Sequence, residues 1–236
     1  MSDLTPKQHV ALAAAQVVRS GMRLGLGSGS TVGLIVEALG ERVQRGELRD
    51  LRVVVASRWT ETKALAAGLT VVELNDVVQL DLAIDGADEV DPQRAMIKGG
   101  GGALLRERIV LYAARERLIA VDESKLVPHL GASWALPVEV VQFGWRVAEA
   151  ALRALGTTPQ LRRDGMQPFV TDEGNYILDC PFRLRAPQAQ PGAAQGHDPH
   201  ELDRALRAIP GVMDHGLFLG LADRVLVGQA DGVREL

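Results

Sequence analysis

The feature that most restricts the fold is the alternation of short apolar runs with helix-forming segments along the first half of the chain. The apolar runs lie at 23–26, 51–56, 70–74, 80–84 and 118–121. Short strands buried on both faces and joined by helices are typical of a parallel sheet covered on both sides. The sequence therefore predicts an α/β fold with a doubly wound, mostly parallel, Rossmann-like sheet. Its helices are expected at 5–20, 32–45, 61–67 and 103–117.

The pattern changes after Gly131. Strands are expected at 136–142, 169–171, 176–180 and 212–219, with helices at 145–155 and 201–209. This β-α-β-β-α-β order is that of a small ferredoxin-like α+β domain. A last strand at 224–228 is expected to return to the first sheet. The predicted division is a Rossmann-like catalytic domain, 1–130 plus 216–236, interrupted by the smaller domain, 131–215.

Composition narrows the function classes. The net charge of −4 gives no sign of the basic face that nucleic-acid binders carry. No apolar run approaches the roughly 18 residues of a membrane span, and the N-terminal residues do not resemble a signal peptide. The one cysteine, Cys180, fits a reducing compartment. We therefore expect a cytoplasmic protein without nucleic-acid or membrane partners.

Residues 185–200, rich in Pro, Gln, Ala and Gly, are predicted to form a mobile surface loop whose role the sequence does not indicate.

A glycine- and serine-rich turn follows the first apolar run. Gly27-Ser28-Gly29-Ser30-Thr31 stands between that run and the helix expected from Val32. Unpaired N–H groups and the positive end of the dipole make a helix N-terminus favourable for an anion. The turn is therefore either a phosphate cradle with added hydroxyl donors or a tight turn in which Ser30 or Thr31 caps the helix.

The same turn is a poor dinucleotide fingerprint. Counting from Gly25 or from Gly27, the third glycine position holds Ser30 or Val32. No acidic residue for a ribose diol follows the strand at 51–56. Arg58 could face a 2′-phosphate, so an NADP-dependent oxidoreductase remains an alternative.

An acidic segment follows the strand at 80–84. Asp85-Gly86-Ala87-Asp88-Glu89-Val90-Asp91 lies at the carboxyl end of that strand, where open α/β sheets bind ligands. Its carboxylates could bind sugar hydroxyls, transfer protons or hold a cation, or form a solvated acidic turn. No metal site is expected, because the histidines are scattered: His9, His129, His197, His200 and His215.

Lys98 is followed by four glycines, Gly99 to Gly102, and then by a helix that carries Glu107. Successive glycines are entropically costly and are typical of backbone that runs close to a ligand. Lys98 adds positive charge for a phosphate or a developing oxyanion. Taken alone, Glu107 is expected as an ordinary helix residue and Lys125 as a surface lysine.

As an ordered set, these segments resemble ribose-5-phosphate isomerases of the A type. The resemblance rests on 27–31, 85–89 and 98–101, with Arg106-Glu107. Further matches are Asp122-Glu123-Ser124-Lys125, Leu136-Pro137-Val138-Glu139-Val140 and Ile209-Pro210-Gly211-Val212. They follow the family's order and spacing over most of the chain.

The resemblance implies an aldose–ketose isomerase that interconverts D-ribose 5-phosphate and D-ribulose 5-phosphate through an enediolate, in the non-oxidative branch of the pentose phosphate pathway. Glu107 is then the base, Asp85 assists ring opening and hydroxyl proton transfer, and Lys98 steadies the enediolate charge. The implied substrate contacts are Ser28, Gly29, Ser30, Thr31, Asp85, Gly86, Ala87, Asp88, Lys98, Gly99, Gly100, Gly101 and Lys125. No cofactor or metal is implied, and the expected assembly is a homodimer.

Departures from the family pattern are few. Ser28 replaces the usual threonine, Leu105 and Arg108 replace the threonine and lysine common beside the base, and the loop at 185–200 is longer than usual. Two further alternatives remain. A sugar-phosphate-sensing regulator of similar fold should carry a helix-turn-helix, but one helix precedes Gly21. A CoA transferase would use a glutamate nucleophile.

Overall fold

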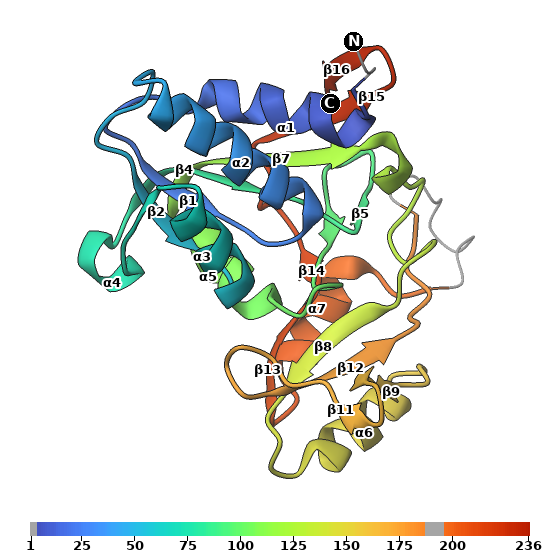
Figure 1. Ribbon diagram of the computed structural model, residues 1–236. Coiled ribbons are helices and arrows are strands. Elements are labelled where there is room, and N and C mark those ends of the chain that lie inside the picture. Colours follow the sequence, from blue (N-terminus) through green and yellow to red (C-terminus); the bar gives the residue numbers. More distant parts are fainter. Residues whose placement is uncertain (1–3, 187–195) are drawn as a thin grey trace. The chain divides into compact units, whose positions relative to one another are not determined.

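The computed structural model describes residues 4–186 and 196–236, and the chain divides into two compact units (Figure 1). Unit 1 comprises Met1–Ala87, Arg106–Lys125 and Gly220–Leu236, and unit 2 comprises Asp88–Leu105 and Leu126–Leu219. Residues 88–105, expected in the catalytic domain, thus cluster with unit 2. The functional domains 1–130 plus 216–236 and 131–215 stay a prediction.

Unit 1 is built on a seven-stranded sheet of order β16-β15-β7-β4-β1-β2-β3. All neighbouring strands are parallel except β15 and β16, which are antiparallel. The predicted mostly parallel sheet is confirmed. The strands are β1 (Arg23–Leu26), β2 (Arg52–Val55), β3 (Thr70–Val71), β4 (Leu80–Asp85), β7 (Ala114–Asp122), β15 (Arg224–Gln229) and β16 (Gly232–Glu235).

Helices lie on both faces of this sheet (Figure 1). On one face, α1 (Pro6–Val17) and α2 (Ser30–Gln44) bury apolar side chains against Leu24, Leu26 and Ile84. On the other face lies α5 (Leu104–Ala113), which belongs to unit 1 from Arg106 on. A Cβ at Gly25 of β1 would clash with the side chain of Val110, so glycine at 25 lets α5 approach the strand closely. The remaining helical elements of unit 1 are α3 (Arg58–Ala66), α4 (Leu74–Val77) and the 3-10 turn Glu123–Lys125.

The predicted helix at 103–117 is too long. It ends at Ala113, and the next residues open β7, where Ala114 pairs with Leu80 of β4. The N–H and guanidinium of Arg117 both bind Asp223, and this tertiary contact favours the strand. The helix predicted from 61 begins at Arg58, because the Ser57 hydroxyl caps it by accepting the N–H of Thr60.

Unit 2 contains a four-stranded antiparallel sheet of order β13-β8-β12-β9. Its elements are β8 (Leu136–Val140), α6 (Trp145–Ala154), β9 (Gln160–Leu161), β12 (Tyr176–Cys180), α7 (Pro199–Arg207) and β13 (Val212–His215). The predicted β-α-β-β-α-β order is present, but its second strand is β9. The strand predicted at 169–171 is wrong: the N–H of Thr171 bonds to Asn175 O in a tight turn.

Two smaller sheets of unit 2 were not predicted, although the strand predicted at 212–219 is divided between β13 of the four-stranded sheet and β14 of one of them. One has the order β14-β6-β5 and the other pairs β10 with β11. Their strands are β5 (Glu89–Val90), β6 (Met96–Ile97), β14 (Leu217–Phe218), β10 (Arg163–Asp164) and β11 (Gln167–Pro168). Two-residue strands are too short to show the alternation by which a strand is recognised.

The predicted loop at 185–200 falls partly outside the described residues, at 187–195. The described remainder is regular. The N–H of Arg185 bonds to His197 O, the N–H of His197 bonds to Arg183 O, and α7 already begins at Pro199 with Asp198 as its N-cap. The loop predicted over 185–200 is therefore too long at its end, because 199–200 belong to α7.

Candidate functional site

The turn Gly27–Thr31 lies at the carboxyl end of β1 and opens α2. The N-cap of α2 is Gly29, with φ of 102°, and no side chain caps the helix. The alternative of a Ser30 or Thr31 cap is therefore wrong, and both side chains lie in the first helical turn. Because the first N–H groups of a helix have no intrahelical partner, this helix end suits an anion such as phosphate.

A chain of hydroxyl groups fixes the turn. Ser28 Oγ shares a hydrogen bond of 2.9 Å with Ser57 Oγ, and Ser57 Oγ shares another of 2.9 Å with Thr60. Thr60 Oγ1 donates to Gly27 O at 2.8 Å, which closes the chain onto the turn. Ser57 and Thr60 were not predicted, and the only signal for them is the cap that Ser57 supplies to α3.

Lys7 is a further candidate that sequence reasoning missed. Its Nζ donates to Ser30 Oγ at 3.3 Å. Lys7 and Lys125 also line the same hollow, of about 490 Å³, together with Thr5, Pro6, Asp122, Glu123 and Ser124. Two lysines therefore line a hollow between the start of α1 and the end of β7. No motif surrounds Lys7, so only its place on α1 reveals it.

Asp85 is buried, with 1% of its surface exposed. Its Oδ1 accepts the N–H groups of Gly86 at 2.7 Å and Ser28 at 3.3 Å. A Cβ at Gly27 would overlap the Asp85 carboxylate. The carboxylate of β4 therefore reaches across the end of β1, next to the turn.

Glu107 lies on the same face of the sheet as Asp85. Gly25 faces Val110 and Ala83, and Asp85 is on the Ala83 side of β4 because side chains alternate along a strand. Glu107 precedes Val110 by nearly one helical turn. Since α5 runs directly into the first residue of β7, its N-terminal end lies toward the carboxyl edge of the sheet. Two buried carboxylates, Asp85 and Glu107 (5% exposed), thus stand at this edge.

Unit 1 therefore brings together Ser28–Thr31, Asp85, Gly86 and Glu107 at one edge of its sheet. Lys125 lines the hollow that it shares with Lys7. Ala87, next to Gly86, is the last residue of the first segment of unit 1. The remaining predicted residues, Asp88, Lys98 and Gly99–Gly101, belong to unit 2.

In unit 2, Lys98 is buried (2% exposed). Its N–H bonds to Gly216 O at 3.0 Å, and its Nζ lies 5.6 Å from the centroid of the Phe218 ring, within cation–π range. Asp88 Oδ2 accepts the N–H of Gly100 at 2.7 Å. The structure thus brings Asp88 onto the glycine run.

Glu89, grouped with the acidic segment in the sequence, supports a loop instead. It is fully buried and accepts four hydrogen bonds, from the N–H groups of Gly131, Ser133 and Trp134 and from the Ser133 hydroxyl, at 2.6–2.8 Å. This loop places the Trp134 ring where a Cβ at Gly100 would clash with it. Nothing in the sequence distinguished Glu89 from its acidic neighbours.

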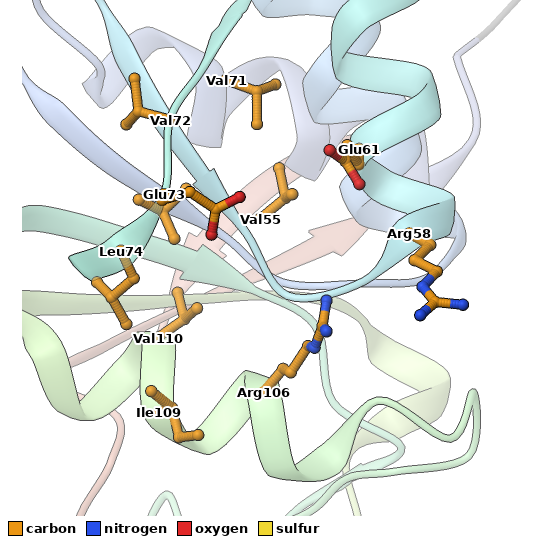
Figure 2. Close-up of a pocket in the computed structure, with 11 residues that line it drawn as sticks. Val55, Arg58, Glu61, Val71, Val72, Glu73, Leu74, Arg106, Ile109 and Val110 are labelled. Carbon is orange, nitrogen blue, oxygen red and sulfur yellow. The ribbon is translucent and has the colours of Figure 1, made fainter. Parts of the chain in front are cut away.

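Figure 2 shows a second hollow of unit 1, of about 330 Å³, in which Arg58 and Arg106 lie at one end. None of the predicted site residues lines it. Its lining consists of Val54, Val55, Arg58, Glu61, Val71, Val72, Glu73, Leu74, Arg106, Ile109 and Val110.

The described residues also bear on metal and membrane partners. Over 4–186 and 196–236, no three His, Cys, Asp or Glu side chains gather closely enough to hold a metal ion. Among the helices of these residues, none has the length and apolarity that crossing a membrane requires. Cys180 is buried, and burial raises the pKa of its thiol.

Comparison with known proteins identifies the family. The model of the family described as ribose 5-phosphate isomerase A (phosphoriboisomerase A) matches residues 52–232. The chain belongs to this family. It is 46% identical to ribose-5-phosphate isomerase A of a Synechococcus strain over 99% of this chain and 97% of that protein. It is also 46% identical to the Chloroflexus aurantiacus protein, over 100% and 94% of the two chains.

Solved structures agree with this assignment. Ribose 5-phosphate isomerase A from Methanocaldococcus jannaschii matches with a TM-score of 0.87 at 37% identity, over 98% of this chain and 97% of that one. A second isomerase structure, described as a complex with phospho-erythronic acid, matches with a TM-score of 0.88 at 34% identity over the same shares. The predicted family and fold are confirmed, and the chain is an isomerase rather than an oxidoreductase, a regulator or a CoA transferase.

Proposed function

We propose that this chain interconverts D-ribose 5-phosphate and D-ribulose 5-phosphate in the pentose phosphate pathway, with Glu107 as the base. The observation that carries the assignment of the base is the placement of Glu107 and Asp85, both buried on one face at the carboxyl edge of the sheet. An aldose–ketose interconversion moves a proton between adjacent carbons, and one carboxylate near both carbons can do this.

The roles of the other residues follow from their chemistry. The uncapped N-terminus of α2, with Ser28, Ser30, Thr31, Lys7 and Lys125, binds the substrate phosphate. Asp85 assists ring opening and transfers a hydroxyl proton. The resemblance further assigns Lys98 to the enediolate charge, and a buried ammonium group stabilises a nearby oxyanion more strongly than one in water.

A relative supports the substrate class. The solved isomerase in complex with phospho-erythronic acid is 34% identical to this chain and binds a phosphorylated sugar acid. Such a ligand has a phosphate group and sugar oxygens. The proposed site offers a group for each: a helix end for the phosphate, and polar side chains for the sugar oxygens. No metal or redox cofactor is assigned a role in this reaction.

The proposal is tested by incubating the purified chain with ribose 5-phosphate and measuring ribulose 5-phosphate. Free ribose is the matched control, since it lacks only the phosphate. We expect rapid conversion of the phosphate ester and very slow conversion of ribose. Equal turnover of both would contradict phosphate binding at the α2 turn, and no turnover of either would contradict the function.

We also propose that the enzyme is a cytoplasmic homodimer. The face of unit 1 around α3 and α5 exposes Trp59, Ile109 and Tyr112, and the hollow in Figure 2 carries both arginines and glutamates, which a two-fold axis can pair. Sedimentation should give a dimer for wild type and for Phe143→Glu, which alters an exposed side chain of unit 2. It should give a monomer for Tyr112→Glu. If this variant remains a dimer, the subunits do not meet at the face around α3 and α5.

A further inference from the structure

Arg162, which follows β9 in unit 2, binds the glycine run directly. Its Nη1 donates to Gly99 O at 2.8 Å and to Gly100 O at 3.1 Å. The rest of the guanidinium forms a two-pronged ion pair with Asp179 of β12, in which Nε lies 3.0 Å from Oδ2. One side chain of the small sheet therefore holds two consecutive carbonyl groups of the run.

These two hydrogen bonds fix the orientation of two peptide units. In a trans peptide the N–H points opposite to the C=O. The N–H groups of Gly100 and Gly101 therefore point away from the guanidinium. The first is taken by Asp88 Oδ2 at 2.7 Å, and Gly101 is exposed.

Aromatic side chains border the same run. A Cβ at Gly102 would clash with the Phe169 ring, and one at Gly100 would clash with Trp134. The Arg162 guanidinium itself lies 5.9 Å from the centroid of the Phe169 ring. Each contact limits where the backbone can lie, whereas hydrogen bonds to the N–H and C=O groups determine which way the peptides face.

Four consecutive glycines need such a restraint. Glycine reaches conformations on both sides of the φ map, and Gly99 and Gly102 adopt positive φ values of 101° and 82°. The Gly102 N–H donates to Gly99 O and the Gly100 N–H donates to Asp88 Oδ2. Arg162 adds to these restraints a bond to each of the two carbonyl groups. Donors aimed in advance at developing negative charge lower a barrier more than donors that must reorient during the reaction.

We propose that Arg162, anchored by Asp179, is a positioning residue for the isomerisation, because it orients the peptides of Gly99–Gly101 toward the substrate. This inference rests on the proposed function, in which the glycine run contacts the sugar. Arg162 itself makes no contact with the reacting atoms; it acts through the run. Neither Arg162 nor Asp179 was among the residues predicted from the sequence.

The first test replaces Arg162 with Met, which keeps much of the side-chain length but donates no hydrogen bond. We expect kcat to fall roughly a hundredfold, as a small misplacement of catalytic groups can cause, while KM changes less than about threefold. Arg162→Lys should recover part of kcat, because lysine can reach one carbonyl group but cannot bind both carbonyls and Asp179 in the planar arrangement of arginine.

The matched control is Arg23→Met. Arg23 forms a comparable two-pronged ion pair with Asp81, at the amino ends of β1 and β4, away from the predicted site residues. Both Met variants lose an ion pair, so both should lower the melting temperature, but Arg23→Met should retain wild-type kcat. Equal kcat values for the two folded variants would overturn the proposal.

A second measurement covers the case in which Arg162→Met does not fold. Asp179→Asn leaves Arg162 in place but weakens its anchor, so kcat should fall by a smaller factor of roughly three to ten.

Added guanidinium ion at millimolar concentration should raise kcat of folded Arg162→Ala but not of Glu107→Gln. A wild-type kcat for Asp179→Asn, or no rescue of Arg162→Ala, would overturn the role of Arg162. Wild-type activity in Glu107→Gln would instead overturn the proposed base, whatever Arg162 does.

Discussion

The carboxylate of Asp85 fills the space beside Gly27 that any side chain at position 27 would need. This contact explains a glycine in the turn without any appeal to backbone conformation. It also couples the turn that is proposed to bind phosphate to a proposed catalytic carboxylate, since Asp85 Oδ1 accepts the N–H of Ser28.

Gly27→Ala should therefore displace Asp85. We expect a fall in kcat of at least tenfold and a loss of unfolding free energy of about 1–3 kcal/mol from overpacking. Gly40→Ala is the control, because its Cβ would clash with Ala67 where α2 meets α3, away from the turn. Steady-state kinetics and urea unfolding should show both variants destabilised but only Gly27→Ala impaired in kcat. Normal kcat in Gly27→Ala would contradict a catalytic role for Asp85.

Lys7→Met should weaken binding of the substrate phosphate. Lys7 Nζ donates to Ser30 Oγ at the start of α2, where the substrate phosphate is proposed to bind. Its loss should therefore affect substrate binding rather than the chemical step. KM should rise about tenfold, the value of one charge-assisted hydrogen bond of ~1.4 kcal/mol, with kcat nearly unchanged. Lys63→Met, which removes a surface ion pair with Glu37, should leave KM as in wild type. If KM is unchanged in Lys7→Met, Lys7 does not contribute to binding of the substrate phosphate.

Much of the site was predictable because its residues lie at the ends of strands. Asp85 follows an apolar run, and the glycine-serine turn joins a run to a helix, so topology alone places both at the carboxyl edge. Lys7, Ser57 and Arg162 could not be found in this way. Each acts through a contact between segments far apart in sequence, and no local pattern records such a contact.

In the fold, too, the features set by local sequence were predicted and those set by contacts between distant segments were not. The parallel strands of unit 1 were predicted because burial on both faces leaves continuous apolar runs. The helix at 103–117 was extended too far because Ala114–Arg117 is also a good helix sequence, and its pairing with β4 and Asp223 decides otherwise. The two-residue strands β5, β6 and β14 owe their structure to tertiary contacts that a single sequence does not encode locally.

Glu89→Gln should destabilise unit 2. The carboxylate accepts four hydrogen bonds in a fully buried position, and an amide would turn one acceptor into a donor that faces other donors. A loss of about 3 kcal/mol is expected, typical of a charged group whose buried partners are left unsatisfied. Urea unfolding measures it, with Glu116→Gln as control, which weakens only a partly exposed ion pair with Arg224. If both variants unfold alike, the carboxylate does not hold the loop that carries Trp134.

We expect Asp203 to contribute to the loss of folding stability at low pH. His215 Nδ1 accepts the N–H of Leu217, so Nε2 carries a proton and lies 3.2 Å from Asp203. The hydrogen bond from His215 lowers the pKa of Asp203 to about 2. A lowered carboxyl pKa stabilises the fold above the unfolded value of about 3.9, and this contribution is lost as the pH falls toward 2.

Asp203→Asn should accordingly be less stable than wild type by about 1–2 kcal/mol at pH 6. The difference should shrink as the pH falls below 4. Urea unfolding of both proteins between pH 6 and pH 3 measures the change. A difference that is constant over this range would show that the pair does not titrate with folding.

The central claim is that Glu107 removes and returns the proton during isomerisation. Glu107→Gln keeps the shape of the side chain but cannot accept a proton, so kcat should fall by at least ~10² to 10⁴, the usual effect of losing a general base. KM should change little, because ground-state contacts remain. Glu116→Gln, near the amino-terminal end of β7, should retain the kcat of wild type.

The most direct measurement follows the C2 proton of ribose 5-phosphate by NMR in deuterated water, with wild type and Glu107→Gln compared at equal concentration. Loss of solvent exchange at C2 in parallel with kcat, in a folded variant, is the result predicted. Retention of more than about a tenth of the wild-type rate, too small a loss for a general base, would contradict the account and move the base to Asp85 or Asp88.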